Sequence, residues 1–353
     1  MKQSRSSKLT WLLIAIVGAL TVCPVVMLAL GSFSEGLTAF GVFTVDKYVD
    51  AYTDPSFREV MLNTVVFVIS SSVLSTVLAT FLAYLNTRTD IPFKFLFGIL
   101  SIIPMMIPHL LFSVSWALLL NPSNGLLNLG LKEAFGLEEA PLNIYSMWGM
   151  ILVEGLLDLP IAYLIIAPAM ASFDVALEES SRVSGASAWK TLFRITLPVL
   201  RPAILAAFIL GVVRSLASFA VPSVIGMPGR VPVLATHLYE MIATGFATDY
   251  GKAAAVGMSV LAASVTLIVV YRALTAESER FVTIAGRGFK STVIELGAAR
   301  MPLFALVGVL SFVLIVLPVA VLLYTSFVPY SMVPSARAFS MMTLKHWRDV
   351  LGD

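Results

Sequence analysis

The stretch VMLNTVVFVISSSVLSTVLATFLAYLN, from Val60 to Asn86, carries no charged side chain and decides the fold class. A helix that crosses the hydrocarbon core of a bilayer needs about 20 consecutive, mostly apolar residues, and this stretch is longer. Lipid admits only helices and closed barrels as spanning structures. Barrel strands alternate polar and apolar residues over about ten positions, and this stretch does not alternate in that way. The sequence therefore predicts a transmembrane helix here.

Further blocks of the same kind lie on both sides of this stretch. Together they predict an all-α polytopic membrane protein with about seven transmembrane helices, at approximately 9–31, 60–86, 95–120, 147–172, 200–221, 253–272 and 302–327. Charged residues make up 12% of the 353 residues, about half the fraction of a soluble domain. The composition argues against a soluble fold, and a net charge of +2 is too small to indicate nucleic-acid binding.

The distribution of positive charge predicts how the chain is oriented. If residue 1 is cytoplasmic, alternate loops place 14 Lys and Arg residues on that side and 8 on the other. Positive charge is enriched in cytoplasmic loops, so we expect the N-terminus to be cytoplasmic and residue 353 external. A signal peptide is the alternative for the first block, but the uncharged run from Leu9 to Ser34 is longer than a signal core and lacks an A-x-A site.

The last predicted span is similar to the first. At an offset of 294 residues, Pro24 aligns with Pro318 and Phe33 with Phe327, and several flanking apolar residues also match. After a five-residue insertion, FTVDKYVDAYTD (43–54) aligns with MTLKHWRDVLGD (342–353). Similar composition alone would not reproduce the second segment in the right order. The sequence predicts a first six-span unit at 1–290 and the start of a second, apparently truncated unit at 291–353.

The most informative segment is the predicted cytoplasmic loop LEESSRVSGASAWKTLFRITLPVLRPA, residues 177–203. We expect two short helices, with Gly185 as the left-handed residue that ends the first and Ser187 as the cap of the second. Apolar residues of the second helix recur at the spacing of one helix face, at Trp189, Leu192, Phe193 and Thr196. An interfacial helix lying on the bilayer would have the same pattern, so amphipathicity alone leaves both interpretations open.

The spacing of residues within this loop resembles a known family motif. The match to E-A-A-x3-G-x9-I-x-L-P consists of Glu179-Ser180-Ser181, Gly185, Ile195 and Leu197-Pro198, with serine at both alanine positions. The chain thereby looks like the inner-membrane permease of a binding-protein-dependent ABC importer, and the resemblance covers residues 1–300 in helix order and loop placement. A bacterial-type inner membrane is the localisation that it implies.

The resemblance implies a role for the loop, residues 173–198, in coupling to a separate ATPase subunit. The loop would dock in a groove of the ATPase, with Glu179 as a polar contact, Gly185 as the sharp turn, and Ile195 and Pro198 as the anchor to the fifth span. The remaining residues assigned to the coupling segment are Ser180, Ser181, Ala186, Trp189 and Leu197.

The same resemblance implies partners but no cofactor in this chain. An ATPase dimer would hold ATP and magnesium, an external protein would deliver cargo, and a second permease half, fused or separate, would complete the pathway. The segments SLASFAVPSVIGMPG (215–229) and AESERFVTIAGRGFK (276–290) look like those of fused two-copy permeases of the ferric-iron type. Ferric iron is therefore the expected cargo, with polyamine, thiamine and aminoethylphosphonate as alternatives.

Motifs for catalysis are missing from the sequence. No G-x-x-x-x-G-K-[ST], H-E-x-x-H or G-x-S-x-G pattern occurs, so we expect no enzyme activity in this chain. The three histidines lie far apart in sequence, and no metal site is expected.

Ionisable residues and prolines within spans are the remaining candidates. Glu154 and Asp158 lie four residues apart on one face of the fourth span, and Arg214 lies at a similar depth in the fifth. Charged residues inside a membrane are functional candidates, here for a carboxylate-lined cargo path; the alternative is a structural cluster that Arg214 neutralises. Pro104 and Pro108 interrupt the third span and would form either a gate hinge or a static kink.

Two other functions fit the residues less completely. An ion-coupled secondary transporter would use Glu154 and Asp158 as coupling carboxylates and would need no ATPase. A non-transporting membrane scaffold would use the loop from Glu179 to Pro198 as an interfacial helix, without an obligate partner.

Overall fold

The computed structural model describes residues 3–34, 42–172, 176–243, 249–276, 293–330, 332 and 334–352. Within these ranges the only β-structure consists of two isolated bridges, Ser34 with Phe43 and Thr89 with Ile294. Some predicted features lie outside the described residues: positions 173–175 of the coupling loop, nearly all of the segment 276–290, and the boundary between the two predicted repeat units at residue 290.

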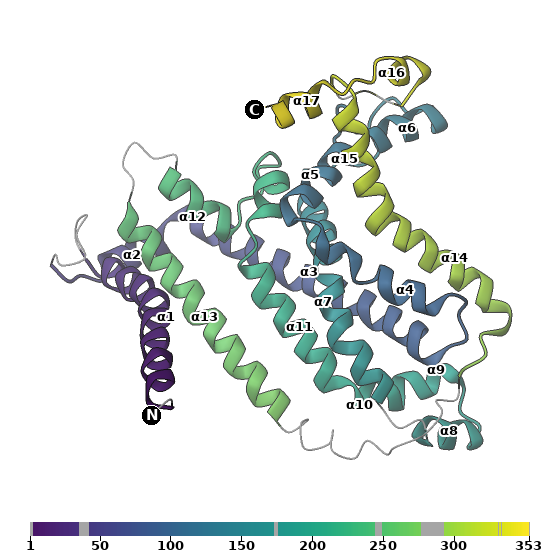
Figure 1. Cartoon of the computed structure of the whole chain (residues 1–353), viewed down its shortest axis with the longest axis horizontal. Coiled ribbons are helices and arrows are strands. Elements are labelled where there is room, and N and C mark those ends of the chain that lie inside the picture. Colours follow the sequence, from purple (N-terminus) through teal and green to yellow (C-terminus); the bar gives the residue numbers. More distant parts are fainter. Residues whose placement is uncertain are drawn as a thin grey trace. The chain divides into compact units, whose positions relative to one another are not determined.

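Helices of very different lengths make up the described chain (Figure 1). The longer ones are α1 (Gln3–Ser32), α3 (Pro55–Arg88), α7 (Met147–Ser172), α11 (Arg201–Leu216), α13 (Tyr250–Ala276), α14 (Arg300–Ser311) and α15 (Leu317–Phe327). The shorter ones are α2 (Asp46–Thr53), α4 (Lys94–Leu100), α5 (His109–Leu120), α6 (Leu126–Phe135), α8 (Ala176–Val183), α9 (Ala188–Thr191), α10 (Leu197–Val199), α12 (Leu234–Ala243), α16 (Ala336–Ser340) and α17 (Lys345–Gly352). Single turns of 3-10 helix form η1 (Ile103–Met106) and η6 (Gly297–Ala299), and π turns form η2 (Leu192–Thr196), η3 (Pro222–Gly226) and η7 (Phe312–Val316).

Five helices are long and apolar enough to cross a membrane. They are Thr10–Ser32, Pro55–Arg88, Met147–Ser172, Tyr250–Ala273 and Gly297–Phe327. Two bent helix pairs bring the number of candidate spans to seven if each pair counts as one span. The prediction of an all-helical polytopic protein with about seven spans is confirmed.

The third predicted span is broken rather than gently bent. The segments Lys94–Met106 and His109–Leu120 meet at an angle of 100°. Pro104 lies in η1, and Pro108 has an extended backbone (ψ 132°) directly before α5. Because proline has no N–H and its ring clashes with the preceding turn, the two prolines disfavour a straight helix across residues 95–120, although Pro160 and Pro168 lie inside the continuous helix α7.

The fifth predicted span also differs from its expected range. We expected a helix at approximately 200–221, whereas α11 ends at Leu216 and is followed by the π turn η3. At its other end, α11 meets the segment Trp189–Val199 at an angle of 68°. The loop helix and the fifth span are therefore directly joined across a bend.

The described helices fall into two compact units, and α3 and α13 contribute to both. The first unit comprises Met1–Leu62 and Val233–Thr266. Its apolar core joins α2, the start of α3, α12 and α13 through Ala51, Phe57, Val60, Leu234 and Val256. Two ion pairs, Lys47 with Asp249 (2.9 Å) and Lys252 with Asp54 (3.0 Å), connect the same helices at their ends.

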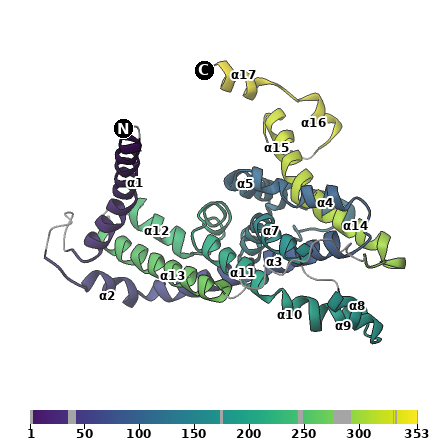
Figure 2. The ribbon, with the colours of Figure 1, turned by 60° about the horizontal axis from the view of Figure 1, so that its bottom comes forward.

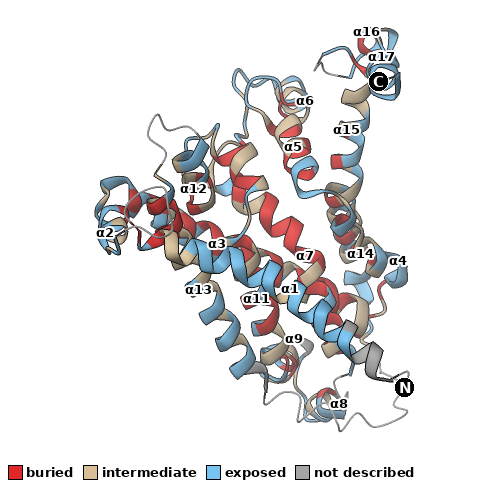
Figure 3. Ribbon diagram, turned by 60° about the vertical axis from the view of Figure 1, so that its left-hand side comes forward, coloured by how far each residue is buried: buried red, intermediate tan, exposed pale blue. Residues whose placement is uncertain are grey.

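The second unit, Asn63–Pro232 with Leu267–Asp353, has α7 at its centre. Figure 3 shows α7 buried along most of its length. The two helices approach closely here: a Cβ on Gly155 would lie 2.7 Å from Cδ2 of Leu74 on α3, and this leucine side chain would have to shift. Beside this core, α14 runs along α4, where the ring of Phe304 lies 6.0 Å from that of Phe93 and 5.6 Å from that of Phe97 (Figure 2).

Three contacts join the end of the first long helix, α1, to the described residues from position 42 onward. The N–H of Thr44 donates to the carbonyl of Phe33 (2.7 Å), and the hydroxyl of Tyr48 donates to Oγ of Ser32 (2.9 Å). The rings of Phe33 and Tyr48 lie 5.1 Å apart. These contacts fold α2 back onto the end of α1.

The turn after α15 has the same contacts at the positions that the sequence repeat aligns. The N–H of Thr343 donates to the carbonyl of Phe327 (2.8 Å), and Nε1 of Trp347 donates to Oγ of Ser326 (3.3 Å). The rings of Phe327 and Trp347 lie 6.1 Å apart. The sequence similarity at 43–54 and 342–353 thus has a matching local geometry.

Asp54 provides a pH-dependent test of the first unit. The hydroxyl of Ser56 donates to this carboxylate, and Lys252 adds a further bond, so the pKa of Asp54 lies well below its ordinary value. A lowered pKa stabilises the fold above the ordinary pKa near 3.8, and the contribution is lost as the pH falls through the lowered value. We expect Asp54→Asn to lower the free energy of unfolding by about 1 kcal/mol at neutral pH and to have less effect in acid, as measured by thermal melting in detergent. Asp50→Asn, an exposed carboxylate on α2, is the control and should change little; an effect of Asp54→Asn that grew in acid would contradict the assignment.

Candidate functional site

The predicted coupling loop folds as two short helices joined by a tight turn. Gly185 has a φ of +82°, as the sequence predicts for the residue that ends the first helix, α8. The N–H of Gly185 donates to the carbonyl of Arg182 (2.9 Å), and that of Ala186 donates to the carbonyl of Ser181 (3.1 Å). This is a Schellman motif, which satisfies the last carbonyls of a helix. No atom lies within 4 Å of a Cβ on Gly185, so the backbone conformation, rather than space, requires glycine.

The second loop helix presents an aromatic surface. Oγ of Ser187 accepts from the N–H of Lys190 (3.3 Å), which is the cap that the sequence predicts. The rings of Trp189 and Phe193, which are one helical turn apart, stack with their centroids 6.0 Å apart. These two side chains are 72% and 61% exposed. The apolar face expected from helical spacing is thus exposed at these two positions, whereas Thr196, one turn further, is buried.

A π turn separates this surface from the fifth span. The N–H of Leu197 donates to the carbonyl of Leu192, five residues back, and Pro198 has no N–H to continue the α-helical pattern. Ile195, Leu197 and Pro198 are all partly buried. These residues lie directly before α11, and the anchoring role of Ile195 and Pro198 stays a prediction.

The serines at the alanine positions of the motif have different environments. Ser180 is exposed, next to the exposed Glu179. Ser181 lies 3.0 Å from the hydroxyl of Thr191 and shares a hydrogen bond with it. Serine at position 181 therefore connects the two halves of the loop, whereas Ser180 and Glu179 stay on its surface.

Sequence reasoning missed a buried polar cluster beneath the loop. Glu178, directly before the motif, accepts from the hydroxyl of Thr196 (2.7 Å) and lies 3.9 Å from Nε of Arg88. Arg88 also donates through Nη2 to the carbonyl of Met170 (2.8 Å). The adjacent residues Glu178 and Glu179 could have indicated this cluster. Neighbouring residues on a helix point about 100° apart, so one glutamate can be exposed while the other is buried.

The two carboxylates of α7 contact residues of α11 and of the segment that follows it. Asp158 accepts from Nε of Arg214 (2.9 Å) and from the hydroxyl of Ser215 (3.2 Å). Glu154, one turn away, accepts from the hydroxyl of Ser218 (2.8 Å). Both carboxylates are buried. The two serines are functional candidates that sequence reasoning did not identify.

This cluster has one cation for two carboxylates. Arg214 neutralises Asp158, which is the geometry of the structural alternative for that residue, whereas Glu154 accepts a hydrogen bond from the hydroxyl of Ser218. The role of Glu154 as a cargo-path residue stays a prediction. Among the described residues, no group of three or more His, Cys, Asp or Glu side chains lies close enough to hold a metal ion.

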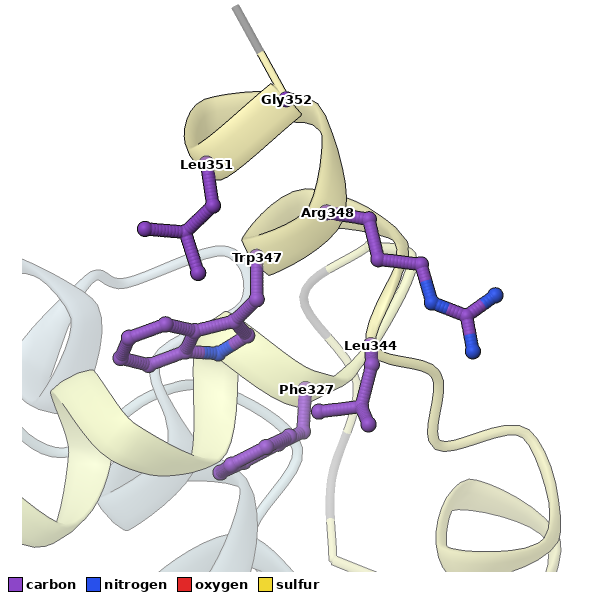
Figure 4. Close-up of a pocket in the computed structure, with 6 residues that line it drawn as sticks. All are labelled: Phe327, Leu344, Trp347, Arg348, Leu351 and Gly352. Atoms are coloured by element: carbon purple, nitrogen blue, oxygen red, sulfur yellow. The ribbon is translucent and has the colours of Figure 1, made fainter.

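The predicted sites are not brought together. The hydrogen bonds described above for the loop and those of Glu154 and Asp158 involve different residues. A further surface pocket lies at the C-terminal end of the described chain (Figure 4) and shares no residue with the predicted sites. Its lining residues are Phe327, Leu344, Trp347, Arg348, Leu351 and Gly352.

Comparison with known protein families identifies this architecture. Residues 71–280 match the model of the family described as binding-protein-dependent transport system inner membrane component. The chain belongs to this family. The match includes the loop with its motif and the α7–α11 core. A permease component of this kind is the membrane part of a transporter and is not itself catalytic.

Individual relatives of this permease are known. A ferric transport system permease protein of Actinobacillus pleuropneumoniae is 28% identical over 284 residues, which are 80% of this chain and 40% of the relative. The chain thus spans well under half the length of that protein. A molybdenum transport system permease protein of Escherichia coli is 30% identical over 196 residues, which are 54% of this chain and 82% of the relative.

A solved structure has the same fold as the permease. A chain of a bacterial alginate ABC transporter, crystallised in complex with an alginate pentasaccharide-bound periplasmic protein, superposes with a TM-score of 0.59 at 20% identity. The superposition covers 81% of this chain and 100% of that chain.

The pair of Arg214 and Asp158 can be tested by removing the cation. We expect Arg214→Met to lower the free energy of unfolding by about 2 kcal/mol, because a buried carboxylate would lose its partner. This is less than the loss for a fully buried pair, since one third of the Arg214 side chain is exposed. Thermal melting in detergent measures the change; Arg201→Met, an exposed arginine on α11, is the control. A second substitution, Asp158→Asn, should recover part of the loss, and unchanged melting of Arg214→Met would show that the pair does not stabilise the fold.

Proposed function

We propose that this permease forms part of the cargo pathway of an ATP-driven importer and couples to a separate ATPase through the loop Glu179–Pro198. One observation carries the proposal: the loop presents the exposed Trp189–Phe193 stack on a capped helix joined directly to the fifth span. Exposed aromatic residues on a rigid support are typical of protein interfaces. Movement of such a docked surface would pass to α11 across the bend.

The proposed partners follow from family membership and from the absence of a nucleotide-binding motif in the sequence. An ATPase dimer would bind ATP and magnesium, and an external binding protein would deliver cargo on the opposite side of an inner membrane. The related alginate transporter, in complex with its periplasmic protein, supports this arrangement by analogy. The positive charge of the loop supports a cytoplasmic position for it and for the N-terminus.

A second permease half completes the proposed assembly. The repeated turn at Ser32–Tyr48 and Ser326–Trp347 supports the interpretation that residues 291–353 begin a second copy of the unit at 1–290. The greater length of the ferric relative is consistent with a two-copy organisation. The cargo pathway would then lie between two six-span halves.

Ferric iron is the proposed cargo. The similarity to a ferric permease extends over 80% of this chain, whereas the similarity to the molybdenum permease extends over 54%. Polyamine, thiamine and aminoethylphosphonate remain alternatives. Glu154 would suit a cationic cargo, whereas the Arg214–Asp158 pair would hold α7 against α11. Pro104 and Pro108, at the 100° break, are the proposed gate hinge.

The family match favours this function over the two other candidates. An ion-coupled transporter has no need of a loop with the ATPase-docking motif. A membrane scaffold has no need of an exposed aromatic stack on a helix that Ser187 caps and that the turn at Gly185 joins to α8. An interfacial helix also presents aromatic residues, so the scaffold makes a distinct and testable prediction.

Substitutions at Gly185 and Trp189 test the coupling role. We expect Gly185→Val to raise the free energy of the left-handed turn by about 1–2 kcal/mol. The variant should still insert into the membrane but should lose ATP-driven uptake. Trp189→Ala should weaken copurification of the ATPase by about tenfold or more, as for an interface hot spot. Ser123→Ala is the control for insertion and yield, because this exposed serine lies outside the coupling loop, between α5 and α6. If both variants retained uptake and ATPase binding, the loop would not be a docking site.

Uptake assays test the proposed cargo. In cells that depend on this transporter we expect the intact system to accumulate radioactive ferric iron, and an excess of unlabelled molybdate should not compete. Glu154→Gln should lower iron uptake by about tenfold, if a carboxylate lines the path, with no loss of protein from the membrane. If Glu154→Gln left iron uptake unchanged, Glu154 would have no role in the cargo path. Competition by molybdate would overturn the assignment of ferric iron as cargo.

A further inference from the structure

A buried ion pair lies where the coupling loop meets the third helix. Arg88 is the last residue of α3, and Glu178 lies in the first turn of α8. Each is only 1% exposed, and Nε of Arg88 lies 3.9 Å from Oε1 of Glu178. Such pairs add little net stability relative to apolar residues, and their best-attested use is to fix one arrangement of packed elements. The position of α8 on the end of α3 is therefore specified by charge.

The same carboxylate also contacts the other half of the loop. Oε1 of Glu178 accepts from the hydroxyl of Thr196 at 2.7 Å. Thr196 is the last residue of the π turn η2, one residue before Leu197 and Pro198 and the bend into α11. Glu178 thus connects the end of α3 with the segment that leads into α11. The hydroxyl pair of Ser181 and Thr191 adds a second connection between the two halves.

A third element is attached through Arg88. Its Nη2 donates to the carbonyl of Met170 at 2.8 Å, in the last turn of α7. A cation is favourable at the C-terminal end of a helix, where carbonyl groups lack helical partners. One buried pair therefore joins the ends of α3 and α7 to both halves of the loop.

Such a cluster has limited tolerance for relative movement. A hydrogen bond to a charged group weakens steeply once its geometry is lost, and separating buried charges without water is costly. If α8 and α9 move, the ends of α3 and α7 must move with them or the cluster must break. Packed, hydrogen-bonded elements of this kind can transmit a displacement between sites.

We propose that Arg88, Glu178 and Thr196 form a linkage that transmits movement between the coupling loop and the spans α3, α7 and α11. The inference rests on the proposed function, since the movement would originate at the ATPase that docks on Trp189 and Phe193. The three residues are positioning residues: their buried side chains hold the loop and do not form its docking surface. Glu178 is thereby assigned a role distinct from that of its exposed neighbour Glu179.

The test compares ATPase binding with signal transmission in the assembled transporter. The full complex of permease, ATPase and binding protein is placed in proteoliposomes, and ATP hydrolysis is measured with and without the binding protein on the opposite side. Thr196→Val removes only the hydroxyl, and Glu178→Gln removes the charge but keeps an acceptor. We expect both variants to bind the ATPase as the unsubstituted chain does, while stimulation of hydrolysis by the binding protein falls about 5-fold or more.

The control is Ser184→Ala, which removes an exposed loop hydroxyl that donates to the carbonyl of Ser180, four residues earlier. It should retain full stimulation. Unchanged stimulation in both Thr196→Val and Glu178→Gln would overturn the linkage alone. Parallel loss of ATPase binding and of hydrolysis would also overturn it, because the residues would then serve only to fold the loop. If the unsubstituted chain bound no ATPase, the proposed function would fail and the linkage with it.

Discussion

Every backbone N–H and C=O group that enters lipid must find a partner within the protein, and most of the described structure follows from this constraint. Long uncharged stretches become helices because a helix satisfies its own groups. Several departures from α-helix occur at or beside proline, where the ring removes an N–H: at Pro104 and Pro108 the third span breaks, and before Pro198 and Pro318 the helix widens into a π turn. The bends that such positions introduce are the places where a membrane helix bundle of this kind can change direction.

Charge inside the bundle obeys a related constraint, since an ion out of water must be paired or hydrogen-bonded. Two of the three buried carboxylates in the described chain have a cation as partner. Asp158 is held by Arg214 at the α7–α11 interface, and Glu178 is held by Arg88 and Thr196 beneath the loop. The first pair holds two spans together, and the second connects the loop to the ends of several spans. The cap at Ser187 and the turn at Gly185 fix the two helices of the loop locally, as the proposed coupling to an ATPase would require.

The two similar turns show how little sequence is needed to specify a local structure. Between Ser32–Tyr48 and Ser326–Trp347, a serine, a phenylalanine, a threonine and a second aromatic side chain recur, and the hydrogen bonds recur with them. Tyrosine and tryptophan exchange because each has an apolar ring and one donor. The common geometry is consistent with an internal duplication and with a protein built from two related halves.

The sequence by itself determined the fold class, most of the spans, the turn at Gly185 and the cap at Ser187, because these depend on local length, charge and backbone preference. It also placed Glu154 and Asp158 on one face of the fourth span through helical spacing, and Arg214 at a similar depth in the fifth span. Only the tertiary structure decided that the third span is broken by 100°, that Trp189 and Phe193 are exposed, and that Glu178 rather than Glu179 is buried. The partners of Glu178 come from residues 88 and 196. Contacts between such distant positions arise from packing, and no local pattern in the sequence specifies them.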